Sequence, residues 1–189
     1  MRRLLRDRRG ATVVEFALIA APLIMTIMAL TDLAFRAFMG VQLQGAMDQA
    51  ARQVTVGGVT TQTVTTFVQG RMRTLLSSAD VKVKPMSYDD FSTVGKPEPI
   101  TTDTAPLGTY NKGDCFLDLN NNKQWDADGG AGGNGGGDDI IYYTATVSYP
   151  ALMPLGRFLG FPDLTTITAT MMMRNQPYEA QAQPVTVCT

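Results

Sequence analysis

The sequence predicts an α+β protein in which one long N-terminal helix precedes a small head with a helix packed on an antiparallel sheet. Three observations carry this prediction. Residues 11–54 combine an apolar run with apolar positions at three- and four-residue steps, residues 61–77 repeat helical spacing, and later segments are rich in β-branched and aromatic residues. A chain of 189 residues is long enough for one such head and an appended segment.

The first part of the long helix has the length and composition of a membrane span. Residues 11–31 contain a single charged residue, Glu15, and about 20 apolar residues cross a bilayer core as a helix. The preceding "MRRLLRDRRG" holds five arginines and one aspartate, which is typical of a flank that stays cytoplasmic. An ordinary cleaved signal peptide would have a shorter apolar core and an A-x-A-type exit site. We therefore expect a single-pass transmembrane helix over residues 11–31.

The helix continues beyond the span as an amphipathic rod over residues 32–56. Apolar side chains recur on one face, while arginine, glutamine and aspartate occupy the others. Gly57 and Gly58 then end the helix. The apolar positions are Phe35, Met39, Leu43, Met47, Ala50 and Val54.

The remaining residues, 59–189, form the predicted exported α+β head. A second helix is expected over residues 61–77, and "ADVKVKPMSY" reads as a strand that Pro85 confines to a sheet edge or a bulge. Residues 92–113 are rich in Thr, Pro and Gly and indicate an irregular connection. Further strands are expected at "DCFLDL", "DIIYYTATVSY" and "LTTITATMMMR".

The segment "LMPLGRFLGF", residues 152–161, is more apolar than a surface loop should be. One interpretation is that it packs under the sheet. The alternative is a contact patch for a partner subunit.

The junction before the span suggests how Glu15 is paired. Arg-Arg-Gly, a small residue, and a glutamate at the fifth position after the glycine resemble the type IV prepilin motif. In that family a membrane protease cuts after the glycine, which here places cleavage between Gly10 and Ala11. The new ammonium at Ala11 would lie one helical turn from Glu15. The carboxylate would then be the counter-charge of its own or a neighbouring chain's amine.

The opening "RRGATVVEFALIAAPL" resembles more closely the TadE-like family, minor pilins or pseudopilins of the tight-adherence (Flp) pilus system. "RNQPY", residues 174–178, resembles a segment near the C-terminus of such proteins, with Gln176 where glutamate is usual. The resemblance implies a pilin-like head and a structural assembly role without enzymatic activity. It also implies five partners: a prepilin peptidase, sibling pseudopilins, a major pilin, an inner-membrane assembly platform and the lipid bilayer.

This resemblance, with the basic flank, implies a bacterial inner-membrane protein with a cytoplasmic N-terminus and a periplasmic head. Residues 1–10 would be a cleaved leader. Incorporation into a surface pilus is left open. A second hypothesis is an uncleaved, signal-anchored calcium-binding or adhesive protein of the periplasm or cell surface.

A possible metal site lies in "DLNNNKQWDADGGAGGNGGGDD". Oxygen-bearing side chains at alternate positions are what a chain curling around Ca²⁺ presents, although Lys123 stands at the usual glycine position and Gly129 replaces the final glutamate. The alternative is a polar turn followed by a flexible glycine loop. The expected ligands are Asp118, Asn120, Asn122, Gln124 (through its carbonyl) and Asp126, with further charge from Asp128, Asp138 or Asp139.

The two cysteines, Cys115 and Cys188, have no C-x-x-C spacing and no histidine to complete a zinc site. Free thiols would suit a cytosolic protein, whereas export favours a disulfide between them. The absence of histidine also removes the commonest general base. Beyond residue 10 the chain has 11 basic and 16 acidic residues, and this acidic balance argues against nucleic-acid binding.

Overall fold

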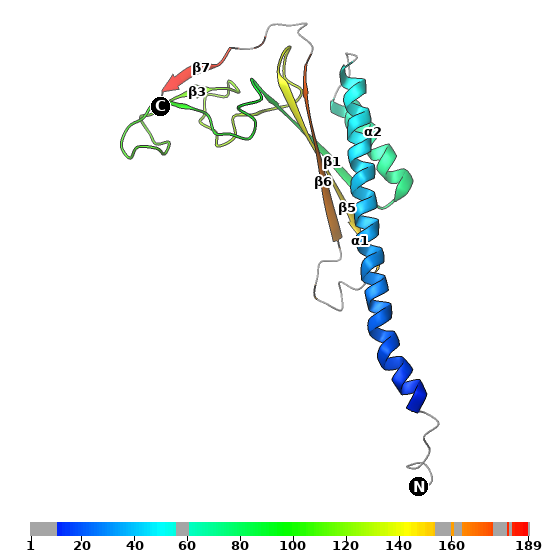
Figure 1. Ribbon diagram of the computed structural model, residues 1–189. Coiled ribbons are helices and arrows are strands. Elements are labelled where there is room, and N and C mark those ends of the chain that lie inside the picture. Colours follow the sequence, from blue (N-terminus) through cyan, green and yellow to red (C-terminus); the bar gives the residue numbers. More distant parts are fainter. Residues whose placement is uncertain are drawn as a thin grey trace.

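The computed structural model describes residues 11–55, 61–153, 160, 164–175, 181 and 183–188. It shows a long helix, a short helix and two antiparallel sheets (Figure 1), which confirms the α+β prediction. The helices are α1 (Ala11–Thr55) and α2 (Thr61–Leu75). The strands are β1 (Asp80–Tyr88), β2 (Ile100–Thr102), β3 (Cys115–Asp118), β4 (Ala131–Gly132), β5 (Ile140–Pro150), β6 (Leu164–Arg174) and β7 (Val185–Cys188).

Helix α1 is continuous from the apolar run into the head, and it passes through Pro22 without ending. The hydroxyls of Thr26 and Thr31 donate to the carbonyls of Pro22 and Ile27, at 2.8 Å in both cases. This back-bonding satisfies polar groups that apolar surroundings would otherwise leave unpaired. The apolar half of the helix extends away from the head as a projecting rod (Figure 1).

The larger sheet has the order β4-β1-β5-β6, and all its strand pairs are antiparallel. Alternation along β5 and β6 directs one set of side chains into the core, and Val147 pairs with Ile167 in the register. Helix α1 packs on β6, and α2 packs on both α1 and β1. The buried positions of α1 are Met39, Leu43, Ala46, Met47 and Ala50. The predicted apolar face of the rod is therefore the face that covers the sheet.

The position of Pro85 differs in detail from the expectation of an edge strand. Strand β1 is second in the sheet, but its neighbour β4 pairs only with Met86 and Ser87. Among the described residues, 80–85 therefore have a strand on one side only. Pro85 lies where this open part of β1 ends, which is compatible with its missing N–H.

The smaller sheet, with the order β2-β3-β7, was not predicted as a separate unit. It lies to one side of the larger sheet, away from α1 (Figure 1). The ring of the buried Phe116 packs edge-on against the ring of Tyr110, with 5.7 Å between the ring centroids. Tyr110 in turn stacks on Trp125, with 4.8 Å between the ring centroids. This aromatic group is separate from the core between α1 and the larger sheet.

Candidate functional site

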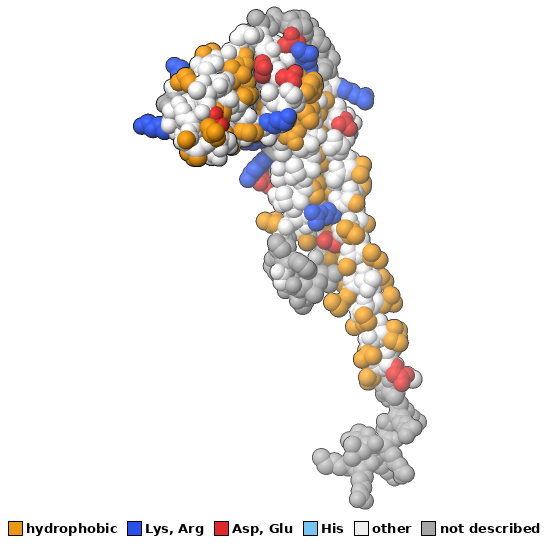
Figure 2. Space-filling view, turned by 60° about the vertical axis from the view of Figure 1, so that its left-hand side comes forward, with side chains coloured by type: hydrophobic (Ala, Val, Ile, Leu, Met, Phe, Trp, Pro, Cys, Tyr) orange, Lys and Arg blue, Asp and Glu red, His pale blue; other side chains and the backbone are white. Residues whose placement is uncertain are grey.

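The N-terminal half of α1 presents an uncovered apolar surface. Figure 2 shows apolar side chains along the projecting rod. By length and composition, one helix in the described part of the chain could cross a membrane, within Thr12–Arg52, and the head does not bury its apolar stretch. The exposed large side chains include Val13, Val14, Phe16, Leu18, Ile19, Leu23, Ile24, Ile27 and Leu30. A surface of this size calls for lipid or the helices of other subunits around it.

Glu15 lies in the second turn of α1 and its side chain is exposed. Ala11 is the first residue of the helix, four positions earlier, so the two residues lie on the same side of the helix. Gly10, the other half of the predicted cleavage site, lies outside the described residues, as does Gln176.

The asparagine-rich loop after β3 curls around two carboxylates. Both oxygens of Asp118 accept backbone N–H groups, from Asn122 at 3.2 Å and Lys123 at 2.8 Å. Oδ2 of Asp126 accepts the side-chain amides of Asn120 and Asn122, at 2.9 and 2.6 Å. The structure thus brings together the residues predicted for the first, third, fifth and ninth ligand positions.

Lys123 adopts the backbone conformation that glycine would take at its position. Its φ is +64°, in the left-handed region. Glycine adopts this region most easily and asparagine and aspartate less easily, whereas other residues rarely adopt it. The loop therefore keeps the sharp bend of the predicted pattern although the glycine is missing.

Glu98 organises the same loop and was not singled out by the sequence. It is 2% exposed, and its two carboxylate oxygens accept the N–H groups of Leu119 and Asp126 at 2.9 and 3.0 Å. Its carbonyl accepts the indole N–H of Trp125 at 3.0 Å. Burial raises the pKa of Glu98, and the nearby charges of Asp118 and Asp126 act in the same direction. A glutamate inside an irregular segment gave no signal of this role.

The later carboxylates make contacts of their own. Asp128 accepts the hydroxyl of Tyr88 at 3.2 Å, and burial together with this bond raises the pKa of Tyr88 to about 12. Asp138 pairs with Nε of Arg174 at 3.2 Å, and Asp139 accepts the N–H of Gly136 at 2.7 Å and the amide of Gln181 at 3.0 Å. Among the described residues, no three acidic or cysteine side chains gather as a metal-binding group.

The glycine-rich loop is packed against the larger sheet. Its residues Ala131 and Gly132 form β4 on the edge of β1. A Cβ on Gly130 would come within 2.7 Å of the Tyr88 ring, so only glycine allows this approach. The loop thereby supports the groove formed by Asn120, Asn122, Asp126 and Asp128.

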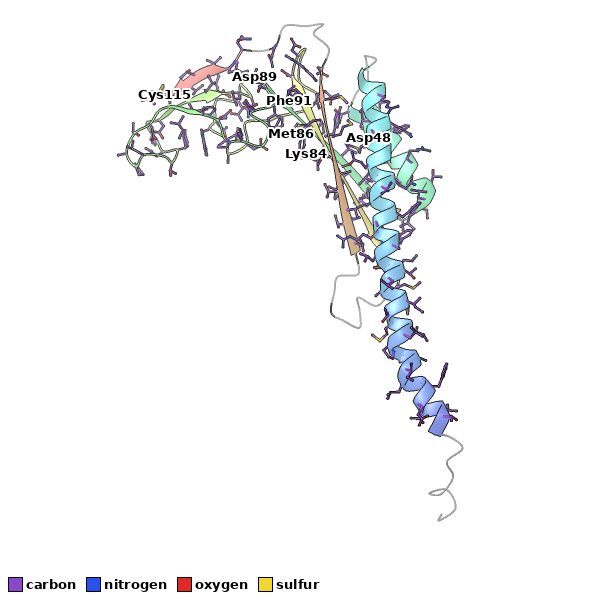
Figure 3. The ribbon with its side chains drawn as sticks, viewed as in Figure 1. Asp48, Lys84, Met86, Asp89, Phe91 and Cys115 are labelled. Carbon is purple, nitrogen blue, oxygen red and sulfur yellow. A yellow bond between two sulfur atoms is a disulfide. The ribbon has the colours of Figure 1, made fainter. Side chains whose placement is uncertain are left out.

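Cys115 and Cys188 form a disulfide, as predicted. The two residues are register partners on the adjacent strands β3 and β7. Figure 3 shows Cys115 in the smaller sheet, away from α1. The bond ties the last described strand to the middle strand of that sheet.

Comparison with known proteins supports the sequence-based resemblance over the long helix. A family model described as TadE-like protein matches residues 10–52. No curated protein and no solved structure matches the chain.

Proposed function

We propose that this chain, TadE-like over residues 10–52, is a minor pilin or pseudopilin, a structural assembly protein of tight-adherence (Flp) pilus biogenesis. The observation that carries the proposal is the uninterrupted α1, which joins an uncovered apolar half to a half that forms the core of a small head. Such a subunit works by association and not by turnover. The apolar half supplies lateral packing in the membrane or among other subunits, and the head selects the contacts outside.

The proposed partners follow from this architecture and from the TadE-like segment. A prepilin peptidase would act at the Gly10–Ala11 junction. Sibling pseudopilins, a major pilin and the inner-membrane platform would pack along the exposed apolar side chains of α1. The N-terminus would be cytoplasmic, next to five arginines, and the head periplasmic. An oxidising compartment is also where the Cys115–Cys188 disulfide would persist.

N-terminal sequencing of the chain from bacterial membranes tests the processing step. We expect a mature protein that starts at Ala11, because cleavage removes the basic leader and creates the ammonium that Glu15 neutralises. The matched control is Gly10→Val, which should leave the chain in the membrane with its leader attached. A wild-type chain that starts at Met1 would contradict the proposal and favour an uncleaved anchor.

We also propose that the asparagine-rich loop binds one Ca²⁺ ion. Support comes from its donor set, two carboxylates and two amide side chains close together, with Gln124 offering its carbonyl. These are the hard oxygen ligands that calcium takes. Bound calcium would neutralise Asp118 and Asp126 and hold the loop closed. Asp128 lines the same groove and offers further charge. Asp138 and Asp139 have other partners in the structure.

Calorimetry of the full chain in detergent checks this prediction. Extracellular calcium modules bind with Kd values of about 0.1–1 mM, and calcium at ten times Kd would add about 1.4 kcal/mol to the free energy of unfolding. Asp126→Asn should remove the heat of binding, whereas Asp80→Asn, in an exposed pair with Lys82, should not. The absence of both heat and a thermal shift at millimolar calcium would refute the site.

A further inference from the structure

The connection between β5 and β6 begins beside the end of the apolar half of α1. The N–H of Leu152, two residues after β5, donates to Oδ1 of Asp32 at 3.1 Å. Asp32 is the first charged residue after the apolar run that closes at Thr31. In Figure 1 the end of β5 and the start of β6, where Pro150 and Leu164 are register partners, lie at the end of the larger sheet nearest the projecting half of α1.

The length of the span fixes the depth of this contact. From Ala11 to Asp32 a helix rises about 31 Å at 1.5 Å per residue, and the hydrocarbon core of a bilayer is about 30 Å thick. When residues 11–31 cross the core, the Asp32 carboxylate therefore lies among the headgroups. The Leu152 amide is hydrogen-bonded to it and lies at the same level.

Contacts of Tyr149 hold the end of β5 against α1. Tyr149 is 1% exposed, and its ring packs edge-on against that of Phe35 of α1, with 5.8 Å between the ring centroids. Within the described part of the chain, its buried hydroxyl has no hydrogen-bond partner. Tyr149 is thus a core contact that fixes the end of β5 against α1.

The described ends of the connection expose apolar side chains at this level. Leu152 is 47% exposed and Leu164, the first residue of β6, is 61% exposed. The sequence between them, "MPLGRFLGFPD", continues the apolar character with one arginine and one aspartate. Exposed leucines at this depth are stabilised by the acyl chains, whereas in water their exposure is unfavourable.

We propose that the end of β5 and the start of β6 rest on the lipid surface, with Leu152 and Leu164 among the headgroups and upper acyl chains. The head then has two contacts with one bilayer, the α1 span and these two leucines, which fix both its distance from the membrane and its rotation about α1. The inference rests on α1 spanning a bilayer, as proposed above, and is independent of the pilus role.

Tryptophan fluorescence in vesicles tests this contact. The chain has one tryptophan, Trp125, which lies beside the smaller sheet, so the wild type supplies the baseline. Leu152→Trp and Leu164→Trp are introduced separately at these exposed sites. The full chain is reconstituted at low protein-to-lipid ratio in phosphatidylcholine–phosphatidylglycerol vesicles that carry no bromine, bromine on the acyl chains near the headgroups, or bromine near the chain ends. We expect bromine to quench most of the added emission in both variants.

Two further variants make the outcomes distinguishable. Leu23→Trp, near the middle of the span, should be quenched by the bromine near the chain ends, and Leu107→Trp, at a site that is 75% exposed in the loop between β2 and β3, should be quenched by neither bromine. Quenching at Leu23 without quenching at Leu152 or Leu164 would overturn the inference and leave the proposed function standing. Loss of quenching at Leu23 as well would overturn both. Unquenched emission that shifts to the blue as protein concentration rises would place a second copy there and reject the lipid assignment.

Discussion

Replacing Glu15 with glutamine is expected to abolish most pilus assembly while leaving the chain inserted in the membrane. The glutamine keeps the size of the side chain but cannot neutralise the ammonium proposed at Ala11. An ionised group at the centre of a span costs roughly 3 kcal/mol on insertion scales. Ala11 lies at the end of the span, so we expect about half of that cost, and each 1.4 kcal/mol is tenfold in an association constant. We therefore expect surface pili to fall at least about tenfold, measured as pilin in sheared fractions and by electron microscopy.

Two controls identify the charge as the cause. Glu15→Asp keeps the carboxylate and should retain part of the piliation. Asp48→Asn removes a carboxylate from the same helix, at the level of the larger sheet (Figure 3), where it is exposed and accepts the Gln44 amide at 3.2 Å. It should leave piliation unchanged. Wild-type numbers of pili in the glutamine variant would rule out the pairing mechanism.

Replacing both Cys115 and Cys188 with serine should lower the stability of the smaller sheet by about 4 kcal/mol. The bond joins residues 73 positions apart, and in the chain-entropy model a closed loop of this length restricts the unfolded state by about that amount. The smaller sheet has little core of its own to offset the loss, chiefly Phe116 and the aromatic pair beside it.

Trp125 gives this prediction a local readout, because it stacks on Tyr110 beside the smaller sheet. Its fluorescence should report unfolding at a lower denaturant concentration in the double-serine variant. The far-ultraviolet signal, to which α1 and the larger sheet contribute most, should change much less. Reduction of the wild-type chain should reproduce the variant. A Trp125 transition that stays at its wild-type midpoint would show that strand pairing alone holds β7.

The elements predicted correctly from sequence are those with a strong local pattern. Residues 11–54 carry the apolar run and the helical spacing that become α1, and β5 and β6 are long segments of β-branched and aromatic residues. Strands β2, β4 and β7 have two to four residues each and little alternation. They are strands because partners lie beside them, and a single sequence does not show those partners.

The candidate sites divide in the same way. The curl of residues 118–126 could be predicted because alternating oxygen donors close on their own backbone over a few residues. Glu98 could not, since its role depends on the tertiary approach of a segment about 20 residues earlier. The contact of Asp32 with Leu152 spans 120 positions and was equally invisible. The Cys115–Cys188 bond could be predicted because the sequence contains two cysteines, which can pair within the chain in one way.

The continuity of α1 has a mechanical consequence. The helix has no break between its apolar half and residues 39–50, which are locked between α2 and the larger sheet. An axial pull on the N-terminal end is therefore carried along the backbone hydrogen bonds of one helix, which lack a single N–H donor at Pro22. It reaches the head as shear across the α1–β6 contact, where many side chains share it at once. Within the described residues, tension along α1 therefore passes directly from its apolar half into the head.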